Sequence, residues 1–124
     1  MLKFSKSWKS SVKPRKQRNY IARAPKHTKS KMMVSHLSDD LSKKHKRRSL
    51  RVVVGDKVTV MTGQFKTKTG KVEKVDLSKG KVYIAGVELQ KKDGTKVKYP
   101  ITSSNLMITE LKEDKKRLES IKRE

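Results

Sequence analysis

Short alternating apolar segments within residues 52–85 are the feature that most limits how this chain can fold. Val58 and Val60 stand two positions apart, as do Val82 and Ile84. In an extended segment, each of these β-branched pairs falls on one face, which predicts half-buried strands. The stretch therefore predicts a strand, a loop, a second strand, a turn and a third strand.

The segment between the first two strands, residues 61–70, has the composition of a loop that meets a polyanion. Gly63 and Gly70 permit positive φ angles and let another backbone come close. Lys66, Lys68 and Lys71 add cationic tips. An ordinary solvated hairpin loop has the same composition, so both interpretations stay open.

The alternation continues beyond this stretch. Turns are expected at 76–80 and 91–94, and five or six short strands over about sixty residues are typical of a small, partly open barrel of the SH3-like kind. Val72 and Val75 stand three apart, which predicts a β-bulge. We expect a mainly β domain over residues 51–110. Its predicted core consists of Val54, Val58, Val60, Val72, Val75, Val82, Ile84, Val87, Leu89, Val97 and Ile108.

The charge of the chain restricts its partners. Its 34 Lys and Arg against 12 Asp and Glu give a net charge of +22, and only 32% of the residues are hydrophobic. Self-repulsion of this size opposes compaction unless a polyanion neutralises it, so nucleic acid is the expected partner. A membrane is disfavoured, because no long apolar run or amphipathic apolar face accompanies the charge.

Residues 1–36 are expected to form an extended basic arm. Residues 1–30 of it lack sustained periodicity and cannot offset their own ordering entropy, so we expect them to be extended or disordered when free. Phe4, Trp8 and Tyr20 interleave with Lys and Arg, a mixture that suits RNA, because rings stack on exposed bases while cations contact phosphates. A solvated basic tail with a role in nuclear import is the alternative.

Two short helices are predicted around the barrel. Within residues 37–50, Ser38 is a candidate N-cap, acidic residues follow it, and the basic run 43–48 ends the helix, as the helix dipole favours. This basic end can reach phosphates or an import receptor. Residues 111–124 show an apolar stripe and possible i,i+4 ion pairs, Glu113 with Arg117 and Glu119 with Arg123, which predict a C-terminal helix packed on its own domain.

The residues needed for catalysis are not grouped in this sequence. There is no cysteine, and His27, His36 and His45 are spaced nine apart, which aligns them on no face. The acidic residues of the barrel stand singly, and Gly70 and Lys71 are not followed by the hydroxyl residue of a P-loop. We expect no catalytic residue, metal, cofactor or small-molecule substrate. An enzyme acting on RNA is the rival hypothesis. The N-terminus does not resemble a secretory signal.

The segment from Gly55 to Gly63, followed by Lys66 and by Gly70-Lys71-Val72, resembles the KOW motif of several ribosomal proteins and transcription elongation factors. KOW sequences usually place glycine after the loop lysine. This chain has Thr67 there, which predicts a different backbone turn at that point.

The resemblance extends over nearly the whole chain, with residues 1–11 matching least. Ala24-Pro25, His27, Lys31, Met33, Ser35, Leu37-Ser38, Leu41 and Arg48-Ser49 are similar to the N-terminal arm in the eukaryotic and archaeal branch of one family. This is the family of KOW-containing large-subunit ribosomal proteins counted twenty-four in bacteria and twenty-six in eukaryotes. The barrel continues the match through Gly86, Lys91-Lys92, Asp93-Gly94-Thr95 and residues 104–109.

This resemblance implies an SH3-like KOW barrel and a structural role in the large ribosomal subunit. It implies binding and folding of large-subunit ribosomal RNA near the exit of the peptide tunnel, with neighbouring ribosomal proteins as further partners. It also implies a cytoplasmic ribosome, with nucleolar assembly if the source is eukaryotic. A KOW module of a transcription elongation factor is the alternative. The expected RNA-binding residues are Lys13, Arg15, Lys16, Arg18, Tyr20, Arg23, Lys26, His27, Lys29, Lys31, Lys46, Arg47, Arg48, Lys66, Lys68, Lys71, Lys91 and Lys92.

Overall fold

A twisted sheet forms the centre of the molecule in a computed structural model that describes residues 4–122. Four α-helices and two 3-10 helices accompany the strands in this part of the chain. The architecture is compatible with a small β-barrel-like domain. The elements are η1 (Lys6–Ser10), α1 (Pro14–Arg23), α2 (Lys26–Met32), β1 (Val34–Leu37), α3 (Asp39–His45), β2 (Ser49–Arg51), β3 (Lys57–Val60), β4 (Thr69–Asp76), β5 (Lys81–Ile84), β6 (Glu88–Gln90), β7 (Lys96–Lys98), β8 (Ile101–Thr102), η2 (Ser103–Asn105), β9 (Leu106–Glu110) and α4 (Lys115–Lys122).

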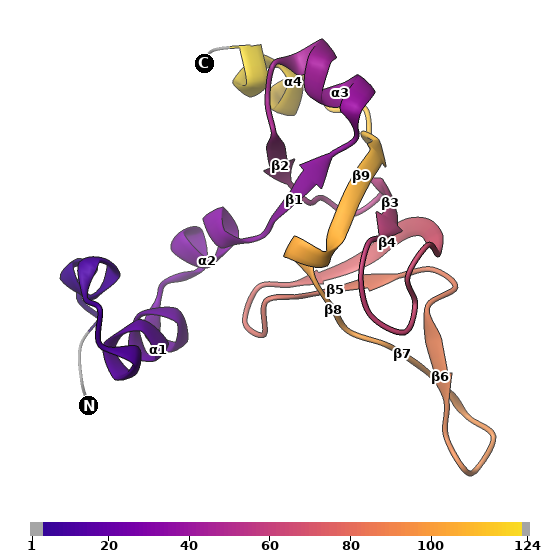
Figure 1. Cartoon of the computed structure of the whole chain (residues 1–124), viewed down its shortest axis with the longest axis horizontal. Coiled ribbons are helices and arrows are strands. Elements are labelled where there is room, and N and C mark those ends of the chain that lie inside the picture. Colours follow the sequence, from indigo (N-terminus) through magenta and orange to yellow (C-terminus); the bar gives the residue numbers. More distant parts are fainter. Residues whose placement is uncertain (1–3, 123–124) are drawn as a thin grey trace.

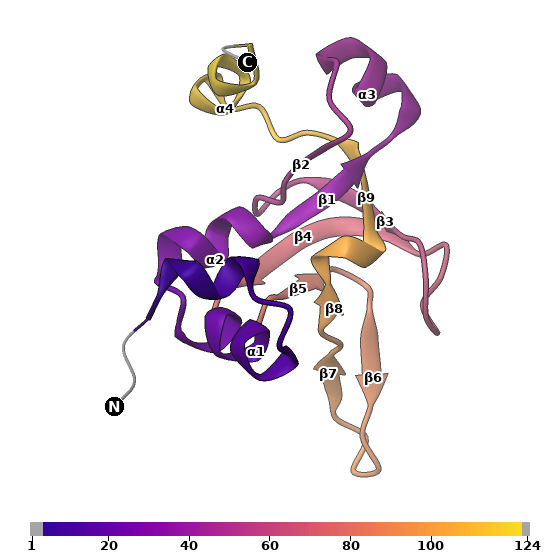
Figure 2. The ribbon, with the colours of Figure 1, turned by 60° about the vertical axis from the view of Figure 1, so that its left-hand side comes forward.

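Seven of the described strands form one sheet in the order β2-β1-β9-β3-β4-β5-β8. Strands β6 and β7 form a separate hairpin, which projects from the sheet away from α3 and α4 (Figure 1). Helices α1 and α2 lie beside the sheet, apart from both the β6–β7 hairpin and the end that carries α3 and α4 (Figure 2). The basic segments therefore extend from the sheet in different directions.

The predicted bulge is present in the pairing of β4 with β5. Val72 pairs with Ile84 and Lys74 with Tyr83, so that Glu73 is the extra residue on β4. The extra residue bends the strand. It also explains why the apolar positions of β4 are three apart.

Most of the predicted core is confirmed. Val58, Val60, Val72, Val82, Ile84, Val87 and Ile108 are buried, and Val75 packs against this core while partly exposed. Val54, Leu89 and Val97 are wrong predictions, with 44%, 42% and 39% of their surface exposed. Val54 lies in a turn, and the other two lie in the projecting hairpin, where the alternation has no second layer to face.

Strands β1 and β2 were not predicted, and they supply much of the remaining core. Strand β1 pairs antiparallel with β2 and parallel with β9, so the sheet begins at Val34. Ser35 is buried on this strand, and its hydroxyl donates a hydrogen bond to the carbonyl oxygen of Ser103 at 2.6 Å. The buried hydrophobic residues of the core cluster that were not predicted are Met33, Leu37, Leu50, Val52, Phe65, Ile101, Leu106 and Ile121.

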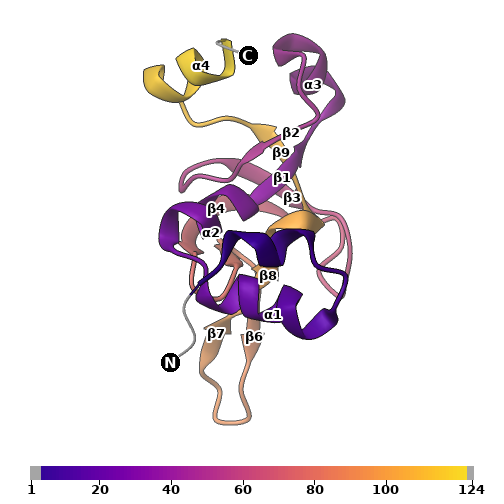
Figure 3. The same ribbon diagram turned by 90° about the vertical axis from the view of Figure 1, so that its left-hand side faces the viewer.

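The N-terminal arm is helical where extended chain was expected, which corrects that prediction. Pro14 occupies the first helical position of α1, where its missing N–H costs nothing, and good helix formers follow it. The side-chain amide of Gln17 donates to the carbonyl oxygens of Lys9 and Ser11, at 3.1 and 2.5 Å, which ties η1 to α1. Figure 3 shows these short helices in front of the sheet.

The helix before the barrel is confirmed as α3. Ser38 occupies its N-cap position, although its hydroxyl makes no capping hydrogen bond. Asp39 and Asp40 stand in the first turn, and the basic residues stand in the last turn. Lys46 then ends the helix in the left-handed conformation, with φ 53°.

The C-terminal helix begins later than expected and makes a different ion pair. Helix α4 starts at Lys115, and its Ile121 is buried in the core cluster, as expected for a helix that packs on its own domain. Arg117 pairs with Asp56 and not with Glu113. The predicted partner of Glu119, Arg123, lies outside the described residues.

Candidate nucleic-acid interface

None of the eighteen residues predicted to bind RNA is buried in the structure. Fourteen are exposed, and Tyr20, Arg23, Lys29 and Arg47 are partly exposed. The structure distributes them over the arm, the end of α3, the β3–β4 loop, strand β4, which carries Lys71, and the β6–β7 hairpin. It does not gather them at one place.

The arm presents its cations on two consecutive helices. Helix α1 carries Arg15, Lys16 and Arg18, and Lys13 is its N-cap residue. Helix α2 carries the side chains of 26–31, and the ammonium group of Lys29 reaches the carbonyl oxygen of Ala22 at 3.5 Å. A helix spaces such cations on different faces, so the arm is cationic around its circumference.

The predicted stacking residue Tyr20 already has an aromatic neighbour. Its ring centroid lies 5.3 Å from that of Phe4, with the planes tilted by 41°. Offset aromatic pairs of this kind are favourable beyond the area they bury. The free chain therefore holds these two rings against one another.

The β3–β4 loop is anchored by an aromatic residue under its lysines. Phe65 is buried, and its ring centroid lies 5.0 Å from that of Tyr99. The ammonium group of Lys68 lies 5.0 Å from the centroid of Phe65, within the range of a cation–π contact. Tyr99 also donates its backbone N–H to the carbonyl oxygen of Val87 at 3.1 Å, so the loop shares its base with the β6–β7 hairpin.

Thr67, where glycine is usual, adopts φ 75°. This is the left-handed region that favours glycine, and the β-branched side chain makes it costly. Its backbone N–H donates to the carbonyl oxygen of Val60 at 2.8 Å, which closes the loop. Threonine therefore adopts, at this point of the loop, a conformation that favours glycine.

The close backbone approach expected at a loop glycine occurs at Gly70. A Cβ atom there would collide with the carbonyl oxygen of Ala85 and lie 2.8 Å from Ile84 Cγ2. Ala85 directly follows β5, and its backbone N–H donates to the carbonyl oxygen of Lys71 on β4 at 3.0 Å. Gly70 thus serves packing between two segments of this protein.

Lys91 and Lys92 lie at the tip of the β6–β7 hairpin, in a turn ordered by Asp93. The carboxylate of Asp93 accepts the backbone N–H of Thr95 at 2.9 Å. Hydrogen bonds from the backbone and side chain of Thr95 hold the pKa of Asp93 below its usual value. Gly94 follows with φ 90°, and its backbone N–H donates to the carbonyl oxygen of Lys91 at 3.0 Å, so the turn predicted at 91–94 is confirmed.

Three of the ion pairs among the described residues neutralise cations elsewhere on the molecule. They join Lys57 to Glu110, Lys98 to Glu73 and Arg117 to Asp56. None of these three pairs involves a residue of the predicted interface.

Three further cations, Lys44, Arg51 and Lys122, line surface hollows beside Arg47 and were not predicted to bind RNA. Lys44 belongs to the basic run 43–48 and could have been included on that ground. The other two belong to segments 71 residues apart in the chain, and only the fold brings them to the same region.

The histidines expected to stand apart are found on α2, β1 and α3. No group of three His, Asp or Glu side chains in residues 4–122 has the geometry of a metal site. Over the same residues, no helix has the length and apolar character needed to span a bilayer.

These observations define a small, strongly basic protein whose cationic segments project from a compact sheet. Comparison with known proteins shows more. A model of the family described as the L26 ribosomal proteins of eukaryotes and the L24 ribosomal proteins of archaea matches residues 11–124, and the chain belongs to this family.

Two archaeal relatives support the same assignment. A protein of Methanosarcina barkeri named "Large ribosomal subunit protein uL24" is 46% identical over 114 residues, covering 91% of this chain and 98% of the relative. A protein of the same name from Methanosphaera stadtmanae is 45% identical over 107 residues, covering 86% and 92%. Membership of this ribosomal family is consistent with a structural role and not a catalytic one.

Proposed function

We propose that this chain is a structural component of the large ribosomal subunit that binds large-subunit ribosomal RNA and helps it fold. The family supports the ribosomal role. The observation that carries the RNA-binding role is the placement of the predicted interface. All eighteen residues are at least partly exposed, on segments that project from the sheet in different directions. Such an arrangement suits a protein that contacts several RNA segments at once.

The two parts of the interface act differently. The sheet holds the β3–β4 loop and the β6–β7 hairpin in place before binding, because Phe65 and Tyr99 pack together at their shared base. The arm, residues 1–36 of the proposed organisation, threads between RNA helices, and residues 37–50 link it to the domain. Each neutralised phosphate releases counterions, so binding weakens with salt by a slope of about −0.7 to −0.9 per contact.

The finer features of the family are part of the proposal. They are an SH3-like KOW barrel over residues 51–110, a C-terminal helical segment at 111–124 and a position near the exit of the peptide tunnel. Neighbouring large-subunit proteins are further partners. The protein works in cytoplasmic ribosomes, with nucleolar assembly if the source is eukaryotic.

Co-purification tests the ribosomal role. The tagged chain, expressed in its source organism, is expected in stoichiometric amounts in large subunits after a high-salt wash. Recovery with RNA polymerase would contradict the proposal and support the elongation-factor alternative, which the comparisons do not favour. Incubation of the chain with labelled RNA and divalent metal is expected to leave the RNA chemically unchanged. Catalytic metals are held by grouped acidic residues, and the acidic residues of the barrel stand singly in the sequence.

The loop lysines provide a second test of the site. Replacing Lys66, Lys68 and Lys71 with Ala is expected to spare folding and to make the salt slope of RNA binding shallower by about 2, at roughly 0.7 for each phosphate no longer neutralised. Filter binding to transcripts of the large-subunit RNA measures both the affinity and its salt slope. Unchanged affinity would show that this loop faces solvent or a protein.

A further inference from the structure

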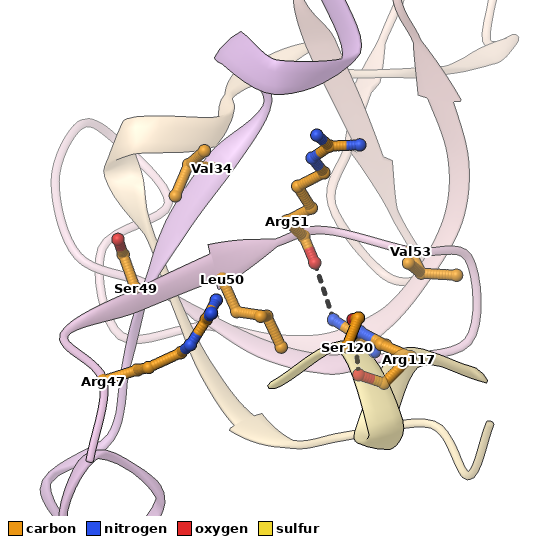
Figure 4. Close-up of a pocket in the computed structure, with 8 residues that line it drawn as sticks. All are labelled: Val34, Arg47, Ser49, Leu50, Arg51, Val53, Arg117 and Ser120. Atoms are coloured by element: carbon orange, nitrogen blue, oxygen red, sulfur yellow. Dashed lines mark hydrogen bonds between the residues drawn. The ribbon is translucent and has the colours of Figure 1, made fainter. Parts of the chain in front are cut away.

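A groove lies between the C-terminal end of α3 and helix α4, at one end of the sheet. Figures 2 and 3 show the two helices standing apart there. Two hollows form the groove and share Arg47 in their linings. One, of about 540 Å³, lies along β2 (Figure 4), and the other, of about 350 Å³, lies between residues 44–47 and 121–122. Both volumes fall within the range of about 300–1,000 Å³ that is common for ligand sites.

The lining of this groove is strongly basic. None of the described residues that line it is Asp or Glu. A concave surface with charges of one sign focuses the field and concentrates counterions. Its cationic side chains are those of Lys44, Lys46, Arg47, Arg51, Arg117 and Lys122.

Arg117 forms a fixed wall of the groove and is not a free ligand. Its Nη1 atom donates to the carboxylate of Asp56. Its Nη2 atom donates to the same carboxylate and, at 2.6 Å, to the carbonyl oxygen of Arg51. Figure 4 shows this bond to the edge of β2, with Ser120 beside it on α4. The guanidinium thereby joins α4 to the strand, which fixes the width of the groove.

Arg51 is available for a ligand. It is exposed, and its guanidinium makes a long contact of 3.4 Å with the hydroxyl of Ser30. Such a contact is weak and easily exchanged for an anion. The hydroxyl of Ser49 lines the same hollow and adds a neutral donor, whereas the hydroxyl of Ser120, on the opposite side, donates to the carbonyl oxygen of Arg117 at 2.8 Å.

The occupant must be anionic, and the edge of the sheet favours a nucleic-acid strand over a peptide. Strand β2 has only three residues, Ser49–Arg51, and Arg117 already occupies one of its outward carbonyl groups. A peptide added as a further strand depends on such backbone groups and would find few. A sugar–phosphate chain instead uses cationic forks and hydroxyls, which the groove supplies.

We propose that the groove between α3 and α4 holds one sugar–phosphate strand of RNA, with phosphates on Lys44, Arg51 and Lys122 and with Ser49 as a hydroxyl donor. The inference rests on the proposed function for the identity of the polyanion. It adds a binding surface built from two segments far apart in the chain.

A charge-matched pair of variants tests this surface. The groove variant carries Arg51→Ala and Lys122→Ala, and the control carries Lys74→Ala and Lys79→Ala, two exposed lysines of the β4–β5 hairpin. Each loses two positive charges. Fluorescent transcripts tiling the large-subunit RNA are bound to each full-length protein over a series of KCl concentrations.

The groove variant is expected to bind its preferred transcript roughly tenfold more weakly, with a salt slope shallower by about 1.4, from two phosphates at roughly 0.7 each. The control is expected to lose much less. Equal losses in the two proteins would overturn the inference. Circular dichroism melts check that both variants remain folded.

A photo-crosslinking residue gives an independent readout of position. Benzoylphenylalanine at Ser120, on the rim of the groove, is expected to crosslink to the bound transcript, whereas the same residue at Ser78, in the β4–β5 turn, serves as the control. Bound RNA without a crosslink at position 120 overturns the groove and leaves the proposed function standing. Failure of the wild-type chain to bind any transcript overturns both. A crosslink from position 120 to polyglutamate but not to RNA would assign the groove to an acidic protein and overturn the inference.

Discussion

Asp56 and Arg117, 61 residues apart in the chain, form a two-pronged ion pair at the junction of the sheet and α4. Arg117 Nη1 lies 2.6 Å from Asp56 Oδ1, and Nη2 lies 2.8 Å from Oδ2. Asp56 is fully buried, and its carboxylate also accepts the backbone N–H groups of Val53 and Lys112, at 3.0 and 2.9 Å. One carboxylate thus connects the turn after β2 to the C-terminal segment.

Replacing Arg117 with Met is expected to lower the free energy of unfolding by about 3–5 kcal/mol, because removing one partner leaves an uncompensated buried charge. The remaining backbone donors cannot neutralise it. Urea denaturation followed by circular dichroism measures the loss. The control is Lys116→Met, an exposed position on the same helix, expected to change stability by less than about 0.5 kcal/mol. Equal stability of the two variants would show that the ion pair does not hold α4.

Replacing Thr67 with Gly is expected to stabilise the protein by up to about 1 kcal/mol, because a left-handed conformation costs an L-residue roughly 1–2 kcal/mol and glycine loses somewhat more entropy on folding. Thermal and urea unfolding measure the gain. Thr69→Gly, at the start of β4, serves as the control and is expected to destabilise. A loss of stability in Thr67→Gly would contradict the strain assigned to this loop.

Two truncations locate the end of the arm. Removing residues 1–32 takes away η1, α1 and α2 but keeps Met33 and strand β1, so the domain is expected to stay folded and to bind RNA more weakly. Removing residues 1–36, a deletion that the predicted arm boundary would allow, also removes most of β1 and the buried Ser35. That chain is expected to melt at a clearly lower temperature by circular dichroism. Identical melting curves would show that β1 contributes little to the sheet.

The turn at the tip of the β6–β7 hairpin is expected to lose order in acid. The pKa of Asp93 is lower in the folded chain than its usual 3.8, so its contribution is present above the unfolded pKa and is lost as pH falls through the folded pKa. The amide proton of Thr95, which donates to this carboxylate, reports the change by NMR. A midpoint at or above 3.8 would contradict the hydrogen bond, and Asp93→Asn should abolish the titration.

The strands, turns and helices that depend on local pattern were predictable. Val58, Val60, Val82 and Ile84 alternate with polar residues, and all four are buried. The bulge in β4 was visible as a broken alternation, because a strand has a strict period of two. The exposed positions of the interface were predictable for a related reason: lysine and arginine are rarely buried without a partner.

The errors arose where a segment's environment is set by a distant part of the chain. Leu89 and Val97 alternate like core residues, but their hairpin projects beyond the sheet, so both are exposed. Residues 34–37 have no strong strand pattern in the sequence. They form a strand because they pair with β9 in the folded sheet. The pairing of Arg117 with Asp56 replaced a local partner by a buried one across the fold.

The sequence by itself determined a small mainly β core, a short helix on each side of it and a strongly basic surface, because periodicity and net charge are local or additive properties. Only the tertiary structure decided that the sheet begins at β1, that Arg117 reaches Asp56, and that α3 and α4 enclose a basic groove. Those relationships join residues tens of positions apart. Their formation depends on the geometry of the folded sheet, which no local pattern in the chain records.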